Sequence, residues 1–339
     1  DLQRQLADEL GVDELTARIQ IDVEVGRGGA TELTVMLVND SPEQSSQVRD
    51  TGLYQTALCV SGIEAQPFQL ESLPDSFRYD RRVPAYGINC GVDAGDEGEF
   101  RSSDVTVANK FRPTYWTVST PEPELTFERL ATDPLPSLRQ LVNAHSSWTN
   151  EAWSQSSLEQ RAQNEAWSDP MHRQADLAAE EAREETLRLE RGLELLETDD
   201  SLLRAFQMMN EAMIESARGR GYASWRPFQV GFLLANLSSI TAGPEETGVV
   251  DILWFATGGG KTETYLGLLV MAAFHDRMTG KSTGVTAWSR FPLRLLSLQQ
   301  TQRFADALAG AEIVRRRHRI DGDPYSLGFF VGSSSTPHR

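Results

Sequence analysis

The segment with the clearest chemical potential is T-G-G-G-K-T, residues 257–262. Lys261 is expected to reach the β- and γ-phosphates of a nucleotide, and the Thr262 hydroxyl is expected to coordinate Mg²⁺. Glycines have no Cβ, so their amides can turn inward and approach phosphate oxygens closely; those expected to do so are Gly258, Gly259 and Gly260. The segment therefore predicts a phosphate-binding loop that starts at Thr257.

The sequence on either side of this loop supports the prediction. An apolar run over residues 249–255 is typical of a buried strand, and a helix is expected from about Thr262 to Met278. The N-terminus of that helix adds partial positive charge beside the loop. The common pattern G-x-x-x-x-G-K-[ST] lacks its first glycine, because Phe255 occupies that position. A glycine-rich turn with an incidental lysine is the alternative interpretation.

A second G-K-S sequence occurs at residues 280–282, but it follows an expected helix and has no glycine upstream in register. It predicts a surface turn. Lysine is scarce, since only Lys110, Lys261 and Lys281 occur. A compact ammonium that points into a phosphate cradle does a task that arginine does poorly, which makes Lys261 notable.

The net charge of −17 argues against a nucleic-acid binder, but the charge is unevenly distributed. Residues 221–339 carry 9 acidic and 12 basic side chains, so the acidity lies upstream of the glycine-rich loop. The last third can therefore tolerate a polyanion. Two cysteines give no disulfide framework, five histidines lack ligand spacing, and no apolar run approaches the roughly 20 residues that span a bilayer. We expect a cytoplasmic protein without membrane contact.

Three regions follow from the hydrophobic patterns. Residues 1–136 are expected to form a β-rich accessory domain, a sandwich or small barrel, because apolar residues alternate at period two between turn signals. Residues 137–221 predict a helical linker or docking region, in which Leu177, Leu187, Leu193 and Leu196 are candidates for an inner face. Residues 222–339 alternate strands and helices, which is the signature of a parallel α/β sheet. Its strands are expected at 249–255, 285–289 and 327–331.

Three elements in the correct order resemble superfamily 2 helicases, including the RecQ group. The T-G-G-G-K-T segment resembles motif I. Arg226-Pro227-Phe228-Gln229 resembles the upstream R-P-x-Q element, whose glutamine reads adenine in this superfamily. Pro292, Arg294, Leu296 and Gln299 match in register the P-T-R-E-L-A-x-Q element, motif Ia, which contacts nucleic-acid phosphates. An ordinary helix start and an amphipathic helix are the alternatives for the last two elements taken singly.

The match is more specific for the DrmA family, the helicase-like subunits of DISARM anti-phage defence systems. The segment from Leu253 to Glu263 and the segment from Arg290 to Leu296 resemble this family, with slight departures at Phe255 and Phe291. The resemblance implies that residues 222–339 form a first RecA-like domain, with Arg226, Gln229 and Glu263 joining residues 257–262 at the nucleotide. It implies DNA contacts by Arg290, Arg294 and Gln299, with the cluster from Arg315 to Arg319 as a rival site. It also implies a DrmB-like protein partner.

The sequence contains no D-E-x-H or D-E-A-D box, so the acidic pair that holds Mg²⁺ is missing. The chain therefore resembles the N-terminal part of an ATP-dependent DNA helicase or translocase whose RecA-like domain stops before that box. Alone it is expected to bind ATP weakly and to hydrolyse little. The DNA would be single-stranded, or a duplex with a single-stranded region. The alternatives are a nucleotide-gated DNA clamp and a scaffold subunit that recruits a partner without unwinding.

Overall fold

The structure is a computed structural model of the 339-residue chain. It describes residues 16–25, 31–41, 53, 55–66, 68–69, 73–78, 82–95, 98–104, 116, 120–219, 221–241, 250–252, 259–291 and 294–328. Of residues 294–298 it describes the backbone. The chain divides into two compact units, residues 1–112 and residues 113–339, and each is described by itself.

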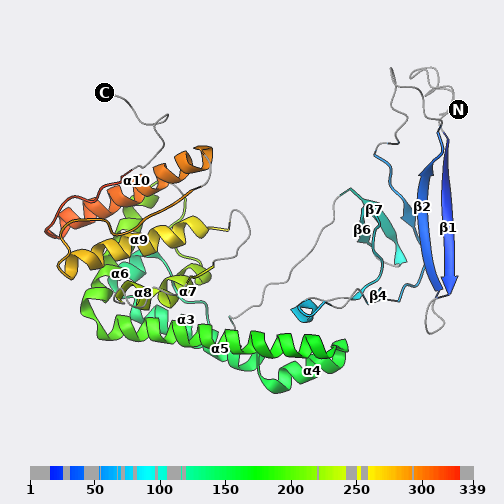
Figure 1. Ribbon diagram of the computed structural model, residues 1–339, viewed down its shortest axis with the longest axis horizontal. Helices are drawn as coiled ribbons and strands as arrows, with labels where there is room; N and C mark the ends of the chain where they lie inside the picture. Colours follow the sequence, from blue (N-terminus) through cyan, green and yellow to red (C-terminus); the bar gives the residue numbers. More distant parts are fainter. Residues whose placement is uncertain are drawn as a thin grey trace, which may run out of the picture. The chain divides into compact units, whose positions relative to one another are not determined.

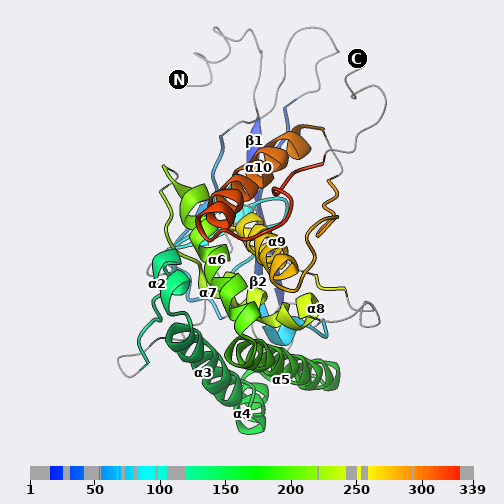
Figure 2. The ribbon, with the colours of Figure 1, turned by 90° about the vertical axis from the view of Figure 1, so that its left-hand side faces the viewer.

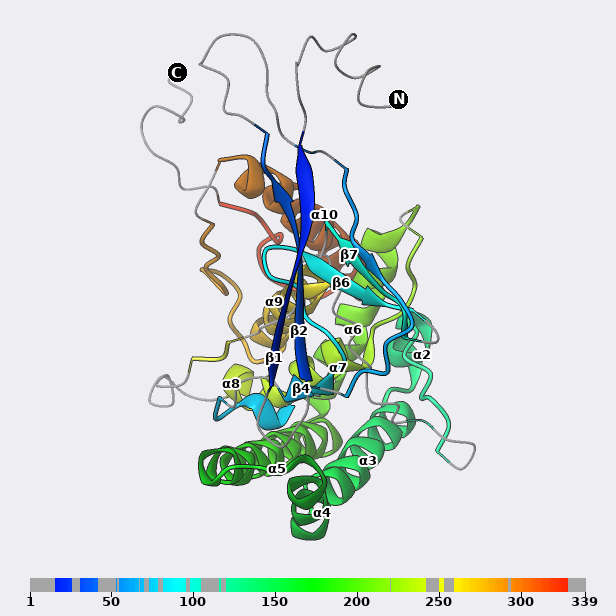
Figure 3. The same ribbon diagram turned by 90° about the vertical axis from the view of Figure 1, so that its right-hand side faces the viewer.

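The first unit contains short strands in three separate antiparallel sheets (Figure 3). One sheet pairs β1 with β2, the second has the order β3-β7-β6, and the third pairs β4 with β5. The elements are β1 (Ala17–Val25), β2 (Thr31–Asn39), β3 (Cys59–Val60), β4 (Phe68–Gln69), the 3₁₀ helix η1 (Ser76–Arg78), β5 (Arg82–Val83), β6 (Gly91–Ala94) and β7 (Phe100–Ser103). The β-rich character is confirmed, but the described residues form small antiparallel sheets and no barrel.

The antiparallel pair of β1 and β2 shows why the sequence predicts strands here and why these strands do not form a barrel. Its apolar residues pair across the strands, as in Ile19 opposite Leu37 and Ile21 opposite Val35, so they share one face. Ile19 and Ile21 are 61% and 57% exposed. Period-two alternation sets which residues share a face, but it does not supply the second layer that would bury them.

The second unit is helical (Figures 1 and 2). Its helices are α2 (Phe127–Thr132), α3 (Leu135–Ala152), α4 (Gln155–Glu165), α5 (Asp169–Thr198), α6 (Asp200–Ala217), α7 (Pro227–Ala235), α8 (Leu237–Thr241), α9 (Lys261–Met278) and α10 (Arg294–Arg317). The break between α5 and α6 is local. The Asp199 carboxylate caps α6 by accepting from the amides of Ser201 (2.9 Å) and Leu202 (3.0 Å). The Ser201 hydroxyl and these amides hold the pKa of Asp199 below its ordinary value.

Helix α6 is the centre of this unit, because it packs against α2, α5, α9 and α10. Phe206, Met208 and Met209 are fully buried on it. Gly310 lets α10 approach closely, since a Cβ there would lie 2.5 Å from the Ala212 carbonyl oxygen. Phe127 of α2, which precedes the boundary expected at residue 136, belongs to the same core as the helices that follow it.

The inner face of α5 differs from the one expected. Leu196 is fully buried, but Leu177 and Leu187 are 51% and 50% exposed, so two of these predictions were wrong. Small residues such as Ala175 and Ala179 occupy the inner face instead. Leucine spacing alone misplaced the face, because α5 packs closely through small side chains.

The parallel sheet expected over residues 222–339 is not formed among the residues that the structure describes. Residues 250–252 and 285–289 are in no strand, and Val250, Ile252, Val285 and Trp288 are 71–87% exposed. A strand needs a partner for its backbone groups, and the described residues provide none for these segments. The flanking helices α9 and α10 are present, so the expected helices are confirmed, whereas the RecA-like domain stays a prediction. None of the described helices combines the length and the apolar character needed to cross a membrane.

Candidate nucleotide site

The start of α7 is fixed by local hydrogen bonds and by a buried tryptophan. Pro227 stands in the first turn, and the Arg226 amide donates to Gln229 Oε1 at 2.7 Å. Trp225 is 3% exposed and its indole N–H donates to Asn210 Oδ1 of α6 at 2.7 Å. The Trp225 ring packs on the backbone of α9, because a Cβ at Gly267 would lie 2.7 Å from Cη2 of that ring. The R-P-x-Q element is thus attached to both neighbouring helices.

The last residues of the glycine-rich loop lead directly into α9. Gly260 is the N-cap residue with a φ of +92°, a left-handed conformation that favours glycine. Because the N-cap residue is a glycine, it makes no side-chain cap bond to the first amides of the helix. Lys261 and Thr262 occupy the first turn and are half-buried. The described end of the loop therefore places a lysine and the first backbone amides of α9 at the positive end of a helix.

Gln229 connects the two elements across 31 residues of sequence. Its Nε2 donates to the Gly260 carbonyl oxygen at 2.7 Å, while Arg226 Nη1 donates to the Gly259 carbonyl oxygen at 3.0 Å. A side-chain amide has two donors and two acceptor sites, so one of each remains on Gln229. Because Gln229 is only 4% exposed, its role in this geometry is to hold the loop. Adenine recognition by Gln229 stays a prediction.

Two neighbouring residues are engaged with other side chains. Thr262 lies one turn before Tyr265 in α9, and the Tyr265 hydroxyl donates to Gln300 Oε1 of α10 at 2.7 Å. Burial raises the pKa of Tyr265, against the effect of Thr262. Glu263 forms an ion pair with Arg303 of α10. This pairing compensates a carboxylate that would otherwise repel phosphate in the first turn of α9.

Several predicted residues lie outside what the structure describes. Thr257 and Gly258 are among them, as is the side chain of Arg294. Arg290 and Gln299 are described and exposed. The structure thus brings together Arg226, Gln229 and the residues from Gly259 to Thr262.

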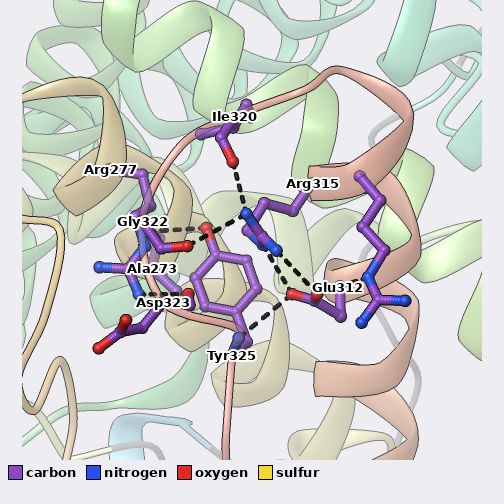
Figure 4. A network of polar contacts seen from close by, with 9 residues as sticks. Ala273, Arg277, Glu312, Arg315, Ile320, Gly322, Asp323 and Tyr325 are labelled. Carbon is purple, nitrogen blue, oxygen red and sulfur yellow. Dashed lines mark hydrogen bonds and ion pairs between the residues drawn. The ribbon is translucent and has the colours of Figure 1, made fainter.

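The rival basic cluster at the end of α10 is largely compensated by carboxylates. Arg315 forms two bonds to Glu312, at 2.7 Å and 2.9 Å (Figure 4). Arg317 pairs with Glu211 and Glu215 of α6, and His318 Nε2 lies 2.9 Å from Glu211. A nucleic-acid site here would have to compete with these pairs, so the cluster serves packing between α6 and α10.

A cavity of about 440 Å³ lies between α4 and α5, away from the residues of α7 and α9. Leu158, Ala175 and Ala179 contribute apolar surface, and carboxylates such as Asp176 and Glu180 line it as well. Its negative charge does not suit a phosphate. Among the described residues no group of three or more His, Cys, Asp or Glu side chains is arranged to hold a metal ion.

Sequence reasoning missed the partners of this site. Neither Arg303 nor Asn210 was singled out as a partner of the nucleotide site. Each of them contacts a residue from another element, Glu263 and Trp225 respectively, and a local sequence pattern does not predict such contacts. The scarcity of lysine was the one available signal, since it pointed to arginine as the general cation of this chain.

These features define a class of site: a glycine-rich loop at a helix N-terminus, held by an upstream R-P-x-Q element, as in helicase-like proteins. No family model matches the chain. The chain is similar to the DISARM protein DrmA of Bacillus paralicheniformis, with 28% identity over 235 residues, which cover 61% of this chain and 20% of that protein. The chain thus spans about a fifth of the length of this curated relative. The resemblance inferred from sequence is confirmed, and the chain is DrmA-like at a distance.

Proposed function

We propose that the chain is the nucleotide- and DNA-binding part of a helicase-like ATPase that acts in anti-phage defence in the cytoplasm. The observation that carries the proposal is the attachment of Gly259 and Gly260, at the start of α9, to Arg226 and Gln229. The similarity to a DISARM protein supports the biological setting. A RecA-like arrangement of residues 222–339 is part of this proposal.

The residues present fit ATP and Mg²⁺. A Cβ at Gly260 would lie 2.9 Å from Gln229 Nε2, so any residue other than glycine would crowd the Gln229 side chain at the start of α9. Lys261 and the first amides of α9 would hold the phosphates, and Thr262 would direct its hydroxyl toward the metal ion. Bound ATP would supply the hydrolysable phosphoanhydride. The chain's own residues orient the phosphates and compensate their charge.

A nucleotide titration with two matched lysine variants tests this proposal. Lys261→Ala should weaken binding of a fluorescent ATP analogue by about tenfold or more, because a charged phosphate contact is lost. Lys281→Ala is the control, since it also follows a glycine but forms an ion pair with Asp276 at 2.7 Å. Equal affinities of the wild type and Lys261→Ala would refute the phosphate-loop assignment.

DNA binding is proposed for Arg290, Arg294 and Gln299, which follow the expected second strand. The compensated state of the rival cluster supports this choice over Arg315 and its neighbours. Each phosphate contact contributes somewhat under one unit to the slope of log affinity against log salt. In single-stranded DNA titrations, Arg294→Ala should lower this slope by that amount, and Arg316→Ala should leave the slope unchanged. The reverse result would move the DNA path to the end of α10.

The protein partner is proposed to be DrmB-like, on the similarity to a DISARM protein. A clamp or scaffold role remains the second proposal. Turnover of ATP by the full-length protein separates these roles, since a motor needs DNA-stimulated hydrolysis and a scaffold does not.

A further inference from the structure

Arg188 joins three elements around the glycine-rich loop. It lies on α5, where its Nη1 contacts Glu185 at 2.9 Å. Its Nη2 donates to Asp251 Oδ1 at 2.6 Å, and the same nitrogen lies 3.4 Å from the Ala235 carbonyl oxygen at the end of α7. The Arg188 and Asp251 side chains are only 29% and 24% exposed. This ion pair is therefore better shielded from solvent than an ordinary surface pair.

Asp251 lies a few residues before the glycine-rich loop, and the other end of the loop is attached to the opposite end of α7. There Arg226 and Gln229 donate to the carbonyl oxygens of Gly259 and Gly260. Helix α7 is nine residues long, so the contact of Arg188 at its C-terminal end and the contacts of Arg226 and Gln229 at its N-terminal end are a fixed distance apart.

Helices α5 and α7 are packed closely enough to act as one support. A Cβ at Gly192 would lie 2.1 Å from the Leu234 carbonyl oxygen, so their backbones are in contact beside Arg188. Leu189 of α5 is buried against α7, since a Cβ at Gly231 would lie 3.8 Å from its side chain. The contact between α5 and α7 therefore does not depend on Arg188 alone, although Arg188 also donates to the Ala235 carbonyl oxygen.

We infer that Arg188 is a positioning residue for the nucleotide site: it anchors Asp251, on the N-terminal side of the glycine-rich loop, to the α5–α7 support that also holds Gly259 and Gly260. This inference rests on the proposed nucleotide binding. A loop held at both ends has less conformational freedom to lose when it binds phosphate, so binding is stronger. The anchor also places α5, a 30-residue helix, in direct contact with the segment that enters the loop.

A double-mutant cycle on nucleotide affinity tests the inference. Arg188→Ala and Asp251→Asn should each weaken binding of the fluorescent ATP analogue by about tenfold, and the double variant should bind no more weakly than either single one. Glu185→Gln is the matched control, because it removes the other carboxylate of Arg188 and leaves Asp251 in place. Its affinity should stay at the wild-type level.

Two affinity results would overturn the inference: losses that multiply in the double variant, or an equal loss in Glu185→Gln. Backbone ¹⁵N relaxation gives a readout that does not depend on nucleotide. Without ligand, the heteronuclear NOE of residues 250–252 should be lower in Arg188→Ala than in the wild type, while that of α5 is unchanged. If the wild type binds no nucleotide, the proposed function fails, and this relaxation measurement alone decides whether the anchor exists. An unchanged NOE at residues 250–252 would overturn it.

Discussion

The ion pair between Glu312 and Arg315 should be a main stabilising contact of the C-terminal end of the helical unit (Figure 4). Both side chains are well shielded, with 15% and 13% exposure. Arg315 also donates to the carbonyl oxygens of Ile320 (2.5 Å) and Gly322 (3.3 Å), and Glu312 accepts from the Tyr325 amide at 3.2 Å. The pair thus holds the segment after α10 against α10 itself.

The magnitude follows from the ionisation of Glu312. The hydrogen bond from Arg315 outweighs burial and lowers the pKa of Glu312 from 4.5 to about 2. Since one pKa unit corresponds to about 1.4 kcal/mol, the charged carboxylate stabilises the folded state by about 3 kcal/mol. Because the folded-state pKa is depressed, this contribution is complete above about pH 4.5 and is lost as the pH falls toward about 2. Arg316 and the Tyr325 amide supply part of this shift, so Arg315→Ala should cost about 2 kcal/mol at pH 7.

Arg316 provides a matched control on the same carboxylate. It contacts Glu312 at 2.8 Å, but its side chain is 71% exposed. Exposed pairs contribute at most about 1 kcal/mol, so Arg316→Ala should change stability little. Urea unfolding at pH 7 and at pH 3, with hydrogen exchange at residues 320–325, measures both effects. Equal losses for the two arginines, or a cost of Glu312→Gln that is the same at both pH values, would refute the reasoning.

Three further predictions use contacts described above. Gly260→Ala should weaken nucleotide binding by about tenfold, because of the left-handed backbone and the contact with Gln229, whereas Gly280→Ala, with a φ of +95° and nothing within 4 Å, should not; equal effects in a binding titration would contradict this. Burial lowers the pKa of His145 despite Glu185 and Glu190, so the unfolded state binds more protons and stability should fall as the pH drops below 6.5. Urea midpoints from pH 8 to 5 should show that slope reduced in His145→Asn, and an unchanged slope would exclude His145. Tyr325→Phe should cost about 1 kcal/mol in urea unfolding, because the hydroxyl donates to the Ala273 carbonyl oxygen at 3.1 Å; no change would show that water replaces this bond.

Several helices of the second unit have local signals in the sequence. A proline stands in the first turn of α5 and of α7, and Asp199 caps α6. Helix α2, in contrast, lies within the residues that were expected to be β-rich. Strands need partners distant in sequence, so the alternation in β1 and β2 predicted their existence but not their small two-stranded sheet. The need for a distant partner also explains why residues 285–289, expected as a strand, form no strand in the structure.

The sequence predicts which residues belong to the candidate site, but not which of them are hydrogen-bonded to one another. The loop and the R-P-x-Q element were visible as motifs, whereas the bond from Gln229 to Gly260 joins residues 31 positions apart. The compensation of Arg317 by Glu211 and Glu215 spans more than 100 positions. Charge counts along the sequence therefore overstated how much positive charge the last third offers to DNA.

Arginine has a common role in this chain that accounts for the distinct position of Lys261. A guanidinium has five N–H donors in a fixed plane, so one side chain can satisfy a carboxylate and a loop carbonyl together. Examples among the described residues, which donate to backbone carbonyl groups with or without a carboxylate, are Arg188, Arg226, Arg277 and Arg315. Each donates from a helix, or from the residue before one, to a carbonyl group outside that helix. An ammonium cannot reproduce this planar geometry, and a guanidinium is too broad for a cradle of backbone amides. Under the proposed function, the lysine at the start of α9 takes the phosphate contact, while arginines make the contacts to carbonyl groups named above.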